Sequence, residues 1–219
     1  MNLLIFLGSA RQSTPPRPAQ LGERVALACQ AHLQSRLDGA SVTLIDPLDF
    51  DTGPVFKPHF AYSERRVPEP LEKLAQAIDA ADAYVMVSPE YNHSMSPALA
   101  DLLNHFGASR FAYKPSAIVT YSAGQWGGVR AAVGMRSFLS ELGCLPVSAM
   151  VHVHQAQNVF SEDGGYQADV DKIRWESYLN RTFTQLWWWA DAAQRQRQQN
   201  DPHRLVGHFT HAPSQRNAP

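Results

Sequence analysis

The chain has 219 residues, of which 44% are hydrophobic and 18% charged, and its formal net charge is −1 at pH 7. This length suits one well-buried core or two small ones, and the near-zero charge argues against a protein built to bind nucleic acid or a membrane surface. Its two cysteines, Cys29 and Cys144, lie in apolar stretches without metal or disulfide spacing, and we expect buried reduced thiols.

Short apolar runs alternate along the chain with amphipathic segments. The first run, residues 2–8, has no basic residues before it and is shorter than the about 20 residues that cross a membrane. We therefore expect a first strand and a cytoplasmic protein. The expected strands are 2–8, 41–47, 82–88, 114–122 and 145–154, and the expected helices are 18–37, 69–81, 95–107, 127–143 and 166–193.

Several local sequence features support these element boundaries. Ser96 and Pro97 are suited to begin the third helix as its N-cap and first residue, and Gly143 is suited to end the fourth. Residues 47–70 hold six prolines and glycines and predict an irregular loop. Residues 194–219 are polar, so we divide the chain into a domain, 1–193, and a C-terminal extension, 194–219.

Five strands that alternate with five helices predict an α/β doubly wound parallel sheet with helices on both faces. The strands are nearly continuous apolar runs, as expected when both faces of a sheet are covered. In such folds ligands bind outside the carboxyl ends of the strands. The segments that follow the first, third and fourth strands are therefore the candidates for a site.

The first of these segments is LGSARQS, residues 7–13. Ser9, Arg11 and Ser13 offer two hydroxyls and a guanidinium beside backbone amides, a combination that suits a phosphate. Neither GxGxxG nor GxxxxGK[ST] occurs here, so neither a dinucleotide fingerprint nor an ATP-binding loop is supported.

The second segment is SPEYNHS, residues 88–94. Pro89 should end the strand, and Tyr91 offers a flat ring for stacking. Asn92 and the backbone amides can bind carbonyls and ring nitrogens. Glu90 has three possible partners, namely Arg11, a second subunit or solvent. We interpret His93 as a polar residue at the rim.

The third segment, YSAGQWGGVRA, is a glycine-rich loop that leads into a helix. Its glycines let a ligand approach the backbone closely, and amides at a helix N-terminus favour negative charge. Trp126 is either a wall of the site or an interface residue. A ligand with a phosphate tail and a planar, carbonyl-bearing ring suits all three segments, and flavin mononucleotide (FMN) is such a ligand, with the amide-rich loop near its N1 and O2.

Three motifs in order resemble those of the NAD(P)H-dependent FMN reductase family of flavodoxin-like proteins, which includes quinone, azo-dye and chromate reductases. They are GSAR (8–11), SPEYNHSMSPALADLLNHF (88–106) and SAGQWGG (122–128), and the resemblance covers about residues 1–155. It implies a five-stranded sheet in the order 2-1-3-4-5. The positions that it implies for the cofactor are Ser9, Arg11 and Ser13 at the phosphate, Pro89, Glu90, Tyr91 and Asn92 along the isoalloxazine, and Ser122, Gly124 and Gln125 at its pyrimidine end.

Two features depart from the family pattern. The first loop is extended by STPPRPAQ (13–20), so Ser13, Arg17 and Gln20 compete as the third phosphate ligand. The segment ADLLN replaces the usual LKN, with Asp101 near the usual Lys.

The resemblance implies a ping-pong oxidoreductase. NADPH or NADH would reduce bound FMN, and a quinone, an azo compound, free flavin or a similar small-molecule electron acceptor would then be reduced at the same face. No protein nucleophile, general base or metal is required, and we assign none. The resemblance and the apolar faces of two helices also imply a homodimer or homotetramer.

Four alternatives remain. A flavin-loaded redox-sensing module that controls a partner protein would use the same pocket. A one-electron flavodoxin carrier usually has a Thr-rich phosphate loop and an acidic face, and neither occurs here. A hydrolase of the SGNH or α/β type would need GDS or GxSxG, and both are absent. His152 and His154 share one face of a strand and could supply two metal ligands, but no third ligand is evident.

Overall fold

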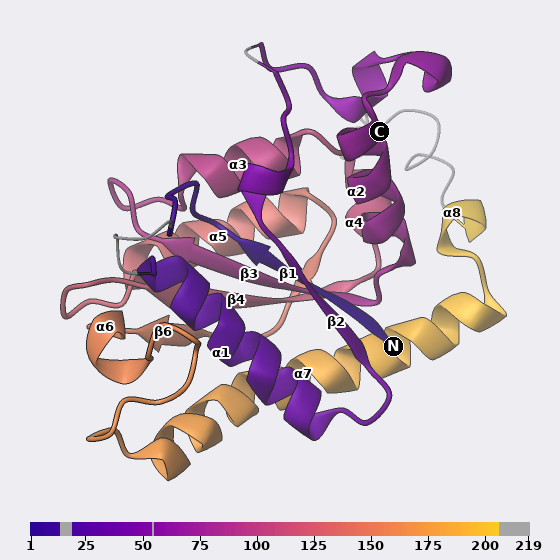
Figure 1. Cartoon of the computed structure of the whole chain (residues 1–219). Helices are drawn as coiled ribbons and strands as arrows, with labels where there is room; N and C mark the ends of the chain where they lie inside the picture. The colour runs from indigo at the N-terminus through magenta and orange to yellow at the C-terminus, as the bar shows by residue number, and fades with distance from the viewer. Residues whose placement is uncertain (14–18, 54, 206–219) are drawn as a thin grey trace.

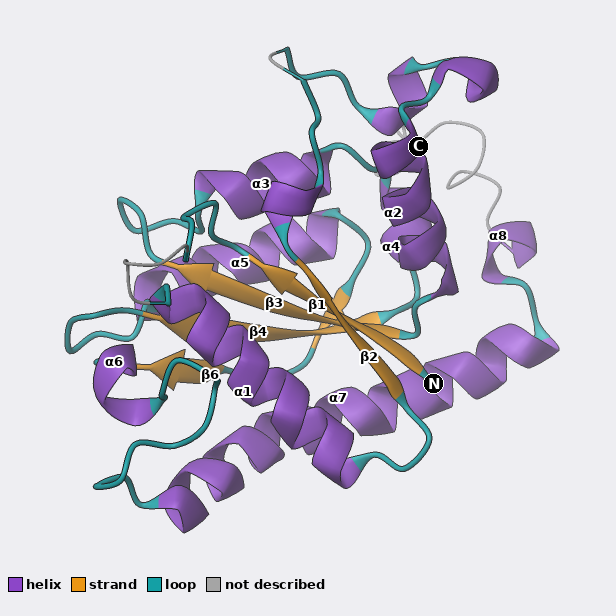
Figure 2. Cartoon of the chain, in the orientation of Figure 1, coloured by secondary structure: helices purple, strands orange, loops and turns teal. Residues whose placement is uncertain are grey.

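A parallel sheet forms the centre of the structure, a computed structural model that describes residues 1–13, 19–53 and 55–205. Its strands run in the order β2-β1-β3-β4-β5, and β6 also pairs with β4 (Figures 1 and 2). The predicted order is therefore confirmed. The strands are β1 Asn2–Leu7, β2 Ser41–Ile45, β3 Ala83–Pro89, β4 Pro115–Tyr121, β5 Leu145–Pro146 and β6 Val151–Val153.

Helices cover both faces of this sheet, and the side chains of β1 show why. Leu3, Ile5 and Leu7 point into the core shared with α1 and α7, whereas Leu4 and Phe6 point into the core shared with α2, α3 and α5. A strand buried on both sides has no polar face, which explains the uninterrupted apolar run in the sequence. The α-helices are α1 Leu21–Arg36, α2 Glu69–Ala80, α3 Pro97–Asn104, α4 Ala108–Phe111, α5 Val129–Glu141, α6 Ala156–Val159, α7 Lys172–Gln199 and α8 Pro202–Leu205.

The loop expected at 47–70 is irregular apart from three short 3-10 turns, η1 Pro47–Asp49, η2 His59–Ala61 and η3 Glu64–Arg66. The third long helix begins as predicted, because the Ser96 hydroxyl accepts a hydrogen bond from the Leu99 amide at 3.1 Å and Pro97 is its first residue. The polar loops after β1, β3 and β4 all leave the same edge of the sheet.

The expected strand 145–154 is interrupted, which corrects the prediction of one continuous fifth strand. Ser116 and Val119 of β4 are three residues apart, but their partners Pro146 and Val151 are five residues apart. The two extra residues make a bulge, and the proline supplies no amide to the ladder. Arg136 of α5 donates to the carbonyls of Val147 and Ser148 within the bulge.

The last long helix lies further along the chain than predicted. It was expected at 166–193, but α7 begins after the N-cap Asp171 and continues to Gln199. Its polar end is anchored, because Gln194 and Arg197 both donate to the carboxylate of Asp82. Residues 194–199 and 202–205 are thus helical, and the rest of the expected extension, 206–219, lies outside the described residues. Among the described helices, none is both long and apolar enough to cross a bilayer.

Candidate cofactor-binding cleft

An open cleft of about 1020 Å³ lies where β1, β3 and β4 end. All three segments singled out from the sequence contribute to it, which places the site at the edge where doubly wound sheets bind ligands. The predicted residues that line it are Ser9, Arg11, Pro89, Glu90, Tyr91 and Ser122. Ser13, Asn92, Gly124 and Gln125 lie outside its lining.

The first loop turns away from β1 at Gly8, whose amide donates to the Val87 carbonyl at 2.7 Å. A Cβ at this position would overlap that carbonyl oxygen, so only glycine lets β1 and β3 end so close together. Ser9 follows and is buried, and its hydroxyl accepts a 3.4 Å hydrogen bond from the Arg11 amide. The Arg11 guanidinium reaches into the cleft toward the Tyr91 hydroxyl, at 3.5 Å.

The structure describes two of the three residues that compete as the third phosphate ligand, Ser13 and Gln20. The Ser13 hydroxyl accepts from the Gln20 amide at 2.9 Å and donates to Glu23 of α1, so Ser13 holds the loop to the start of the helix. Gln20 itself lines the cleft at the N-cap of α1. Arg17 lies outside the described residues.

The second loop leaves β3 at Pro89, the last residue of the strand, as predicted. Tyr91 and Ser94 exchange two backbone hydrogen bonds of 2.9 Å around a tight turn. Both central residues, Asn92 and His93, have positive φ angles, 48° and 62°. Such a turn favours asparagine for its backbone tolerance, and this explains Asn92 without a ligand. The turn presents Tyr91, which is 41% exposed, at the mouth of the cleft.

Glu90 pairs with Arg130 of α5, a partner that the sequence did not suggest. One carboxylate oxygen accepts from the Arg130 guanidinium at 3.0 Å and the other from its amide at 3.3 Å. The same guanidinium lies 5.4 Å from the ring centre of the exposed Trp126. This pair ties the second loop to the start of α5, which is also where the third loop ends.

The third loop is shaped by Ser122. Its hydroxyl donates to the Gly124 carbonyl at 2.8 Å and accepts from the Gly127 amide at 2.9 Å. Gly128, the N-cap of α5, has a φ of 75°, and a Cβ there would lie 2.9 Å from the Thr120 side chain. Gly124 and Gln125 are exposed at the tip of the loop.

The cleft-lining residues that the sequence did not indicate include Gln157, Arg24 and Leu21. Arg24 lies on the core-facing side of α1 between Leu21 and Val25. A charged residue among these apolar positions was the sequence feature that could have identified it. It donates to the Ala19 and Phe160 carbonyls and pairs with Glu162, so it joins the first loop to the segment after α6. Gln157 had no signal, because no element was expected around it.

Burial has the largest effect on the pKa of Tyr121, the last residue of β4. It raises the pKa of this phenol well above the ordinary value, against a smaller lowering by a hydrogen bond with Ser9 and by the charge of Arg11. The phenol therefore stays neutral. It is a hydrogen-bonding wall of the cleft rather than an acid or base near neutral pH.

The two histidines considered as metal ligands have other contacts. His152 Nδ1 lies 2.8 Å from the Thr120 hydroxyl, and the His154 ring packs 5.8 Å from the ring of Trp175. Within the part of the chain that the structure describes, no group of three or more His, Cys, Asp and Glu side chains is placed to hold a metal ion.

Comparison with known proteins points in the same direction as the geometry. A family model described as NADPH-dependent FMN reductase matches residues 1–158. An NAD(P)H-dependent FMN reductase from Pseudomonas aeruginosa is 37% identical over 103 residues, 44% of this chain and 55% of that protein. An NADPH azoreductase from Bacillus sp. is 36% identical over 72 residues, 33% of this chain and 40% of that protein. The chain spans about half the length of the curated relatives it matches.

Solved structures share the fold at low sequence identity. A flavoenzyme NAD(P)H:(acceptor) oxidoreductase from Paracoccus denitrificans has a TM-score of 0.63 at 18% identity, with 84% of this chain and 96% of that chain covered. The apo form of an NADH:FMN oxidoreductase has a TM-score of 0.60 at 18% identity, with 83% of this chain and 87% of that chain covered.

Proposed function

The chain belongs to the NADPH-dependent FMN reductase family, and from this we propose that it is an FMN-dependent oxidoreductase that oxidises NADPH or NADH and reduces small-molecule acceptors. Quinones, azo compounds and free flavin are the acceptor classes in question. The observation that carries the proposal is the cleft, in which a phosphate-type loop, an aromatic loop and an amide-rich loop converge at one edge of the sheet.

Two buried atoms support a fit to FMN. The side-chain Oε1 atoms of Gln20 and Gln157 are buried without a hydrogen-bond partner among the described residues, and both side chains line the cleft. Gln157 Nε2 donates to the Ala123 carbonyl at 3.1 Å, which fixes the amide so that Oε1 is an acceptor. An orphaned buried acceptor is costly, and the ribityl hydroxyls of FMN are suitable donors.

The other residues have distinct roles in this proposal. Ser9 and Arg11 would hold the phosphate, while Ser13 shapes their loop. Pro89, Glu90 and Tyr91 would flank the ring, with Glu90 fixed by Arg130. Ser122 would orient the amides of the third loop near the pyrimidine end, with Gly124 and Gln125 at its tip, and Asn92 would act through the turn. Bound FMN would supply the hydride and electron transfer, and the chain positions it and limits access of water.

The test begins with the visible spectrum of the purified full chain, with FMN added to saturation if it is colourless. Anaerobic NADPH or NADH then follows in the same cuvette. The proposal expects a flavin band that changes on binding and bleaches with the nicotinamide, and parallel double-reciprocal plots when a quinone is the acceptor. Bound flavin that stays oxidised would instead favour a redox-sensing module that controls a partner, and failure to bind flavin would contradict both.

We also propose that the protein assembles as a homodimer or homotetramer. The start of α5 and the loop before it expose apolar side chains, with Trp126 of the loop at 59%, Val129 at 36% and Val133 at 62%. An exposed apolar patch of this kind is typical of an interface. Sedimentation velocity at micromolar concentration should give a dimer or tetramer, and a clean monomer would refute the assembly without touching the flavin proposal.

We assign the reaction to the domain at residues 1–193, which contains every residue that lines the cleft. A cytoplasmic location would suit the use of NADPH or NADH. It is supported by the two cysteines, Cys29 and Cys144, which are both free and buried. Fractionation of cells that express the full chain would test the location directly.

A further inference from the structure

A second cavity, of about 510 Å³, lies at the opposite edge of the sheet, near the starts of β3 and β4. Its size falls within the roughly 300–1,000 Å³ of small-molecule sites. Three cationic side chains line it, Arg110 of α4, Lys114 just before β4 and Arg197 of α7. The proposed flavin chemistry uses none of them.

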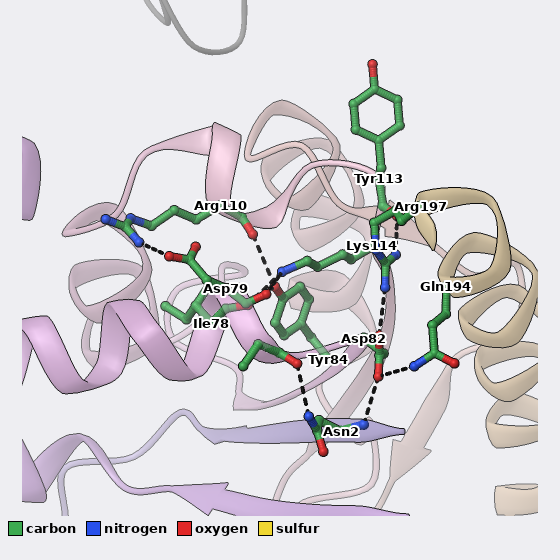
Figure 3. A network of polar contacts seen from close by, with 11 residues as sticks. Asn2, Ile78, Asp79, Asp82, Tyr84, Arg110, Tyr113, Lys114, Gln194 and Arg197 are labelled. Carbon is green, nitrogen blue, oxygen red and sulfur yellow. Dashed lines mark hydrogen bonds and ion pairs between the residues drawn. The ribbon is translucent and has the colours of Figure 1, made fainter. Parts of the chain in front are cut away.

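Lys114 is the most buried of these cations, with 7% of its surface exposed. Its Nζ donates to the carbonyls of Ile78 at 2.7 Å and Asp79 at 2.9 Å, in the last turn of α2 (Figure 3). Among the described residues no carboxylate lies within ion-pair distance of this Nζ, and its charge is buried against the two carbonyl dipoles and 5.8 Å from the centre of the Tyr84 ring.

Loss of the Lys114 proton would cost no hydrogen bond. A neutral amine has two N–H bonds and a lone pair, and the two carbonyls can accept both N–H bonds while the lone pair stays free. Burial is the main cause that lowers the pKa of Lys114 to about 8. The nearby Arg197 charge also lowers this pKa, whereas Asp79, Asp82 and Cys144 raise it. A nucleophilic amine is therefore present near neutral pH.

The carboxylates of Asp79 and Asp201 also line this cavity, and its two arginines provide the N–H donors that an anion needs. Arg110 pairs with Asp79, and Arg197 pairs with Asp82 at 2.8 Å and donates to the Tyr113 carbonyl at 3.0 Å (Figure 3). Each guanidinium carries five N–H donors, and these contacts occupy one on Arg110 and two on Arg197. Guanidinium groups bind phosphate oxygens well, often through two N–H bonds at once.

We propose that Lys114 is a modification site, acylated directly by acyl phosphates in the cavity that Arg110 and Arg197 line. The neutral amine attacks the acyl carbon, a C–N bond forms, and the bond from that carbon to the phosphate oxygen breaks. Phosphate leaves with the electron pair, the amine proton passes to solvent, and an amide remains. The arginines hold the phosphate and stabilise it as it leaves.

The product would change the local contacts in a defined way. An acylated lysine keeps one N–H and loses its charge, so only one of the Ile78 and Asp79 carbonyls retains its donor. The site lies at the other end of the strands from the flavin cleft, and the proposal does not depend on the flavin chemistry.

The chain provides its own reference residues, since its lysines are Lys57, Lys73, Lys114 and Lys172. The full chain would be incubated with acetyl phosphate at several pH values, and acetylation of each lysine would be followed by peptide mass spectrometry. Lys114 should react at least severalfold faster than the exposed Lys73 and Lys172 at pH 8. Its rate should level off above that pH, whereas theirs should rise toward about 10.4, the ordinary lysine pKa.

Two controls separate this site from general lysine reactivity. An uncharged donor, the N-hydroxysuccinimide ester of acetic acid, should give Lys114 a severalfold smaller advantage than acetyl phosphate does, because only the neutral amine and not the arginines favours it. Excess inorganic phosphate should slow acetyl phosphate at Lys114 but not at Lys73. Arg110→Gln, checked for folding by its thermal transition, should slow Lys114 severalfold. Acetylation of Lys114 no faster than of Lys73, or an equal advantage with both donors, would overturn the proposal.

Discussion

Gly8 shows how a single position determines the geometry of the cleft. The loop after β1 must pass within hydrogen-bond distance of the end of β3, and a side chain at this point would meet the Val87 carbonyl and the Leu99 side chain. The backbone there cannot move without disturbing the strand pairing. The residue type is therefore set by space and not by chemistry toward a ligand.

Gly8→Ala should lower the free energy of unfolding by about 2 kcal/mol or more, because the new Cβ displaces one strand end. Urea denaturation would measure this loss. Gly134→Ala is the matched control, since a Cβ at Gly134 of α5 has no atom within 4 Å. It should stabilise the chain by about 0.5–1 kcal/mol through helix propensity. Equal effects of the two changes would refute the steric argument.

Gln157→Leu should weaken binding of riboflavin but not of lumiflavin, which has the same ring without the ribityl chain. The change removes the orphaned acceptor that we assign to a ribityl hydroxyl. One lost hydrogen bond of about 1 kcal/mol corresponds to a roughly fivefold loss of affinity. Flavin fluorescence quenching measures both ligands, and an equal loss for both would place Gln157 at the ring or in the fold of the loop.

The long helix α7 is held at its end by polar contacts rather than by apolar packing. Asp82 lies just before β3 and accepts from the Asn2 amide at 2.9 Å, from Gln194 at 2.9 Å and from Arg197 at 2.8 Å. In Figure 3 these donors converge on the carboxylate from β1 and from α7. The helix therefore continues past the point where its apolar periodicity ends.

Arg197→Met should destabilise the chain by roughly 1–3 kcal/mol, because a partly buried carboxylate loses its charged donor. Hydrogen exchange at the amides of residues 194–199 should accelerate as the end of α7 loosens. Arg195→Met is the control, since Arg195 is exposed and pairs only with Asp191 among the described contacts. Unchanged exchange in the Arg197 variant would show that the contact with Asp82 does not hold the helix end.

The same elements show which parts of the structure could be predicted. Apolar runs predicted the first four strands, because two-sided burial leaves a strong signal, and the family resemblance implied the order of the sheet. The break between Pro146 and Val151 was missed, since the extra residues are apolar or small and only the register with β4 reveals them. The limit of α7 was missed because Gln194 and Arg197 bind a residue over 100 positions away in sequence.

The cleft was predicted in outline and missed in detail for a similar reason. Ser9, Arg11 and Tyr91 follow strand ends directly, so their positions follow from the fold. Asn92 is explained by the backbone of its turn, and a motif alone does not separate that role from ligand contact. Gln157 reaches the cleft from α6, a short helix that the apolar pattern of the sequence did not predict.

The stability of the chain as a function of pH reflects its few buried ionisable groups. The folded pKa of Lys114 is about 8, below the ordinary 10.5, so between these values the unfolded chain binds more protons and stability from this group rises with pH. Cys29 and Cys144 act in the opposite direction. Burial raises the pKa of each thiol from 9.0 to about 12, so their contribution is lost as pH rises through that range.

Comparison with Lys114→Met isolates the lysine, because both thiols are present in each protein. The stability of the parent chain relative to this variant should increase by roughly 2 kcal/mol between pH 7 and pH 9.5. Urea denaturation at the two pH values measures it, and Lys73→Met, which removes an exposed lysine, should show no such change. A difference that does not vary with pH would mean that Lys114 keeps an ordinary pKa.

The triple contact at Asp82 has a topological consequence. The first strand and the end of α7 meet at one carboxylate, so a short peptide could join residue 199 to residue 1 without crossing the sheet (Figure 1). New chain ends could then be opened in the irregular segment at residues 55–58, away from the cleft-lining residues. Exposed loops of this kind tolerate such circular permutation best. In this fold, the order of the elements along the chain could therefore change while their arrangement around the cofactor cleft stays the same.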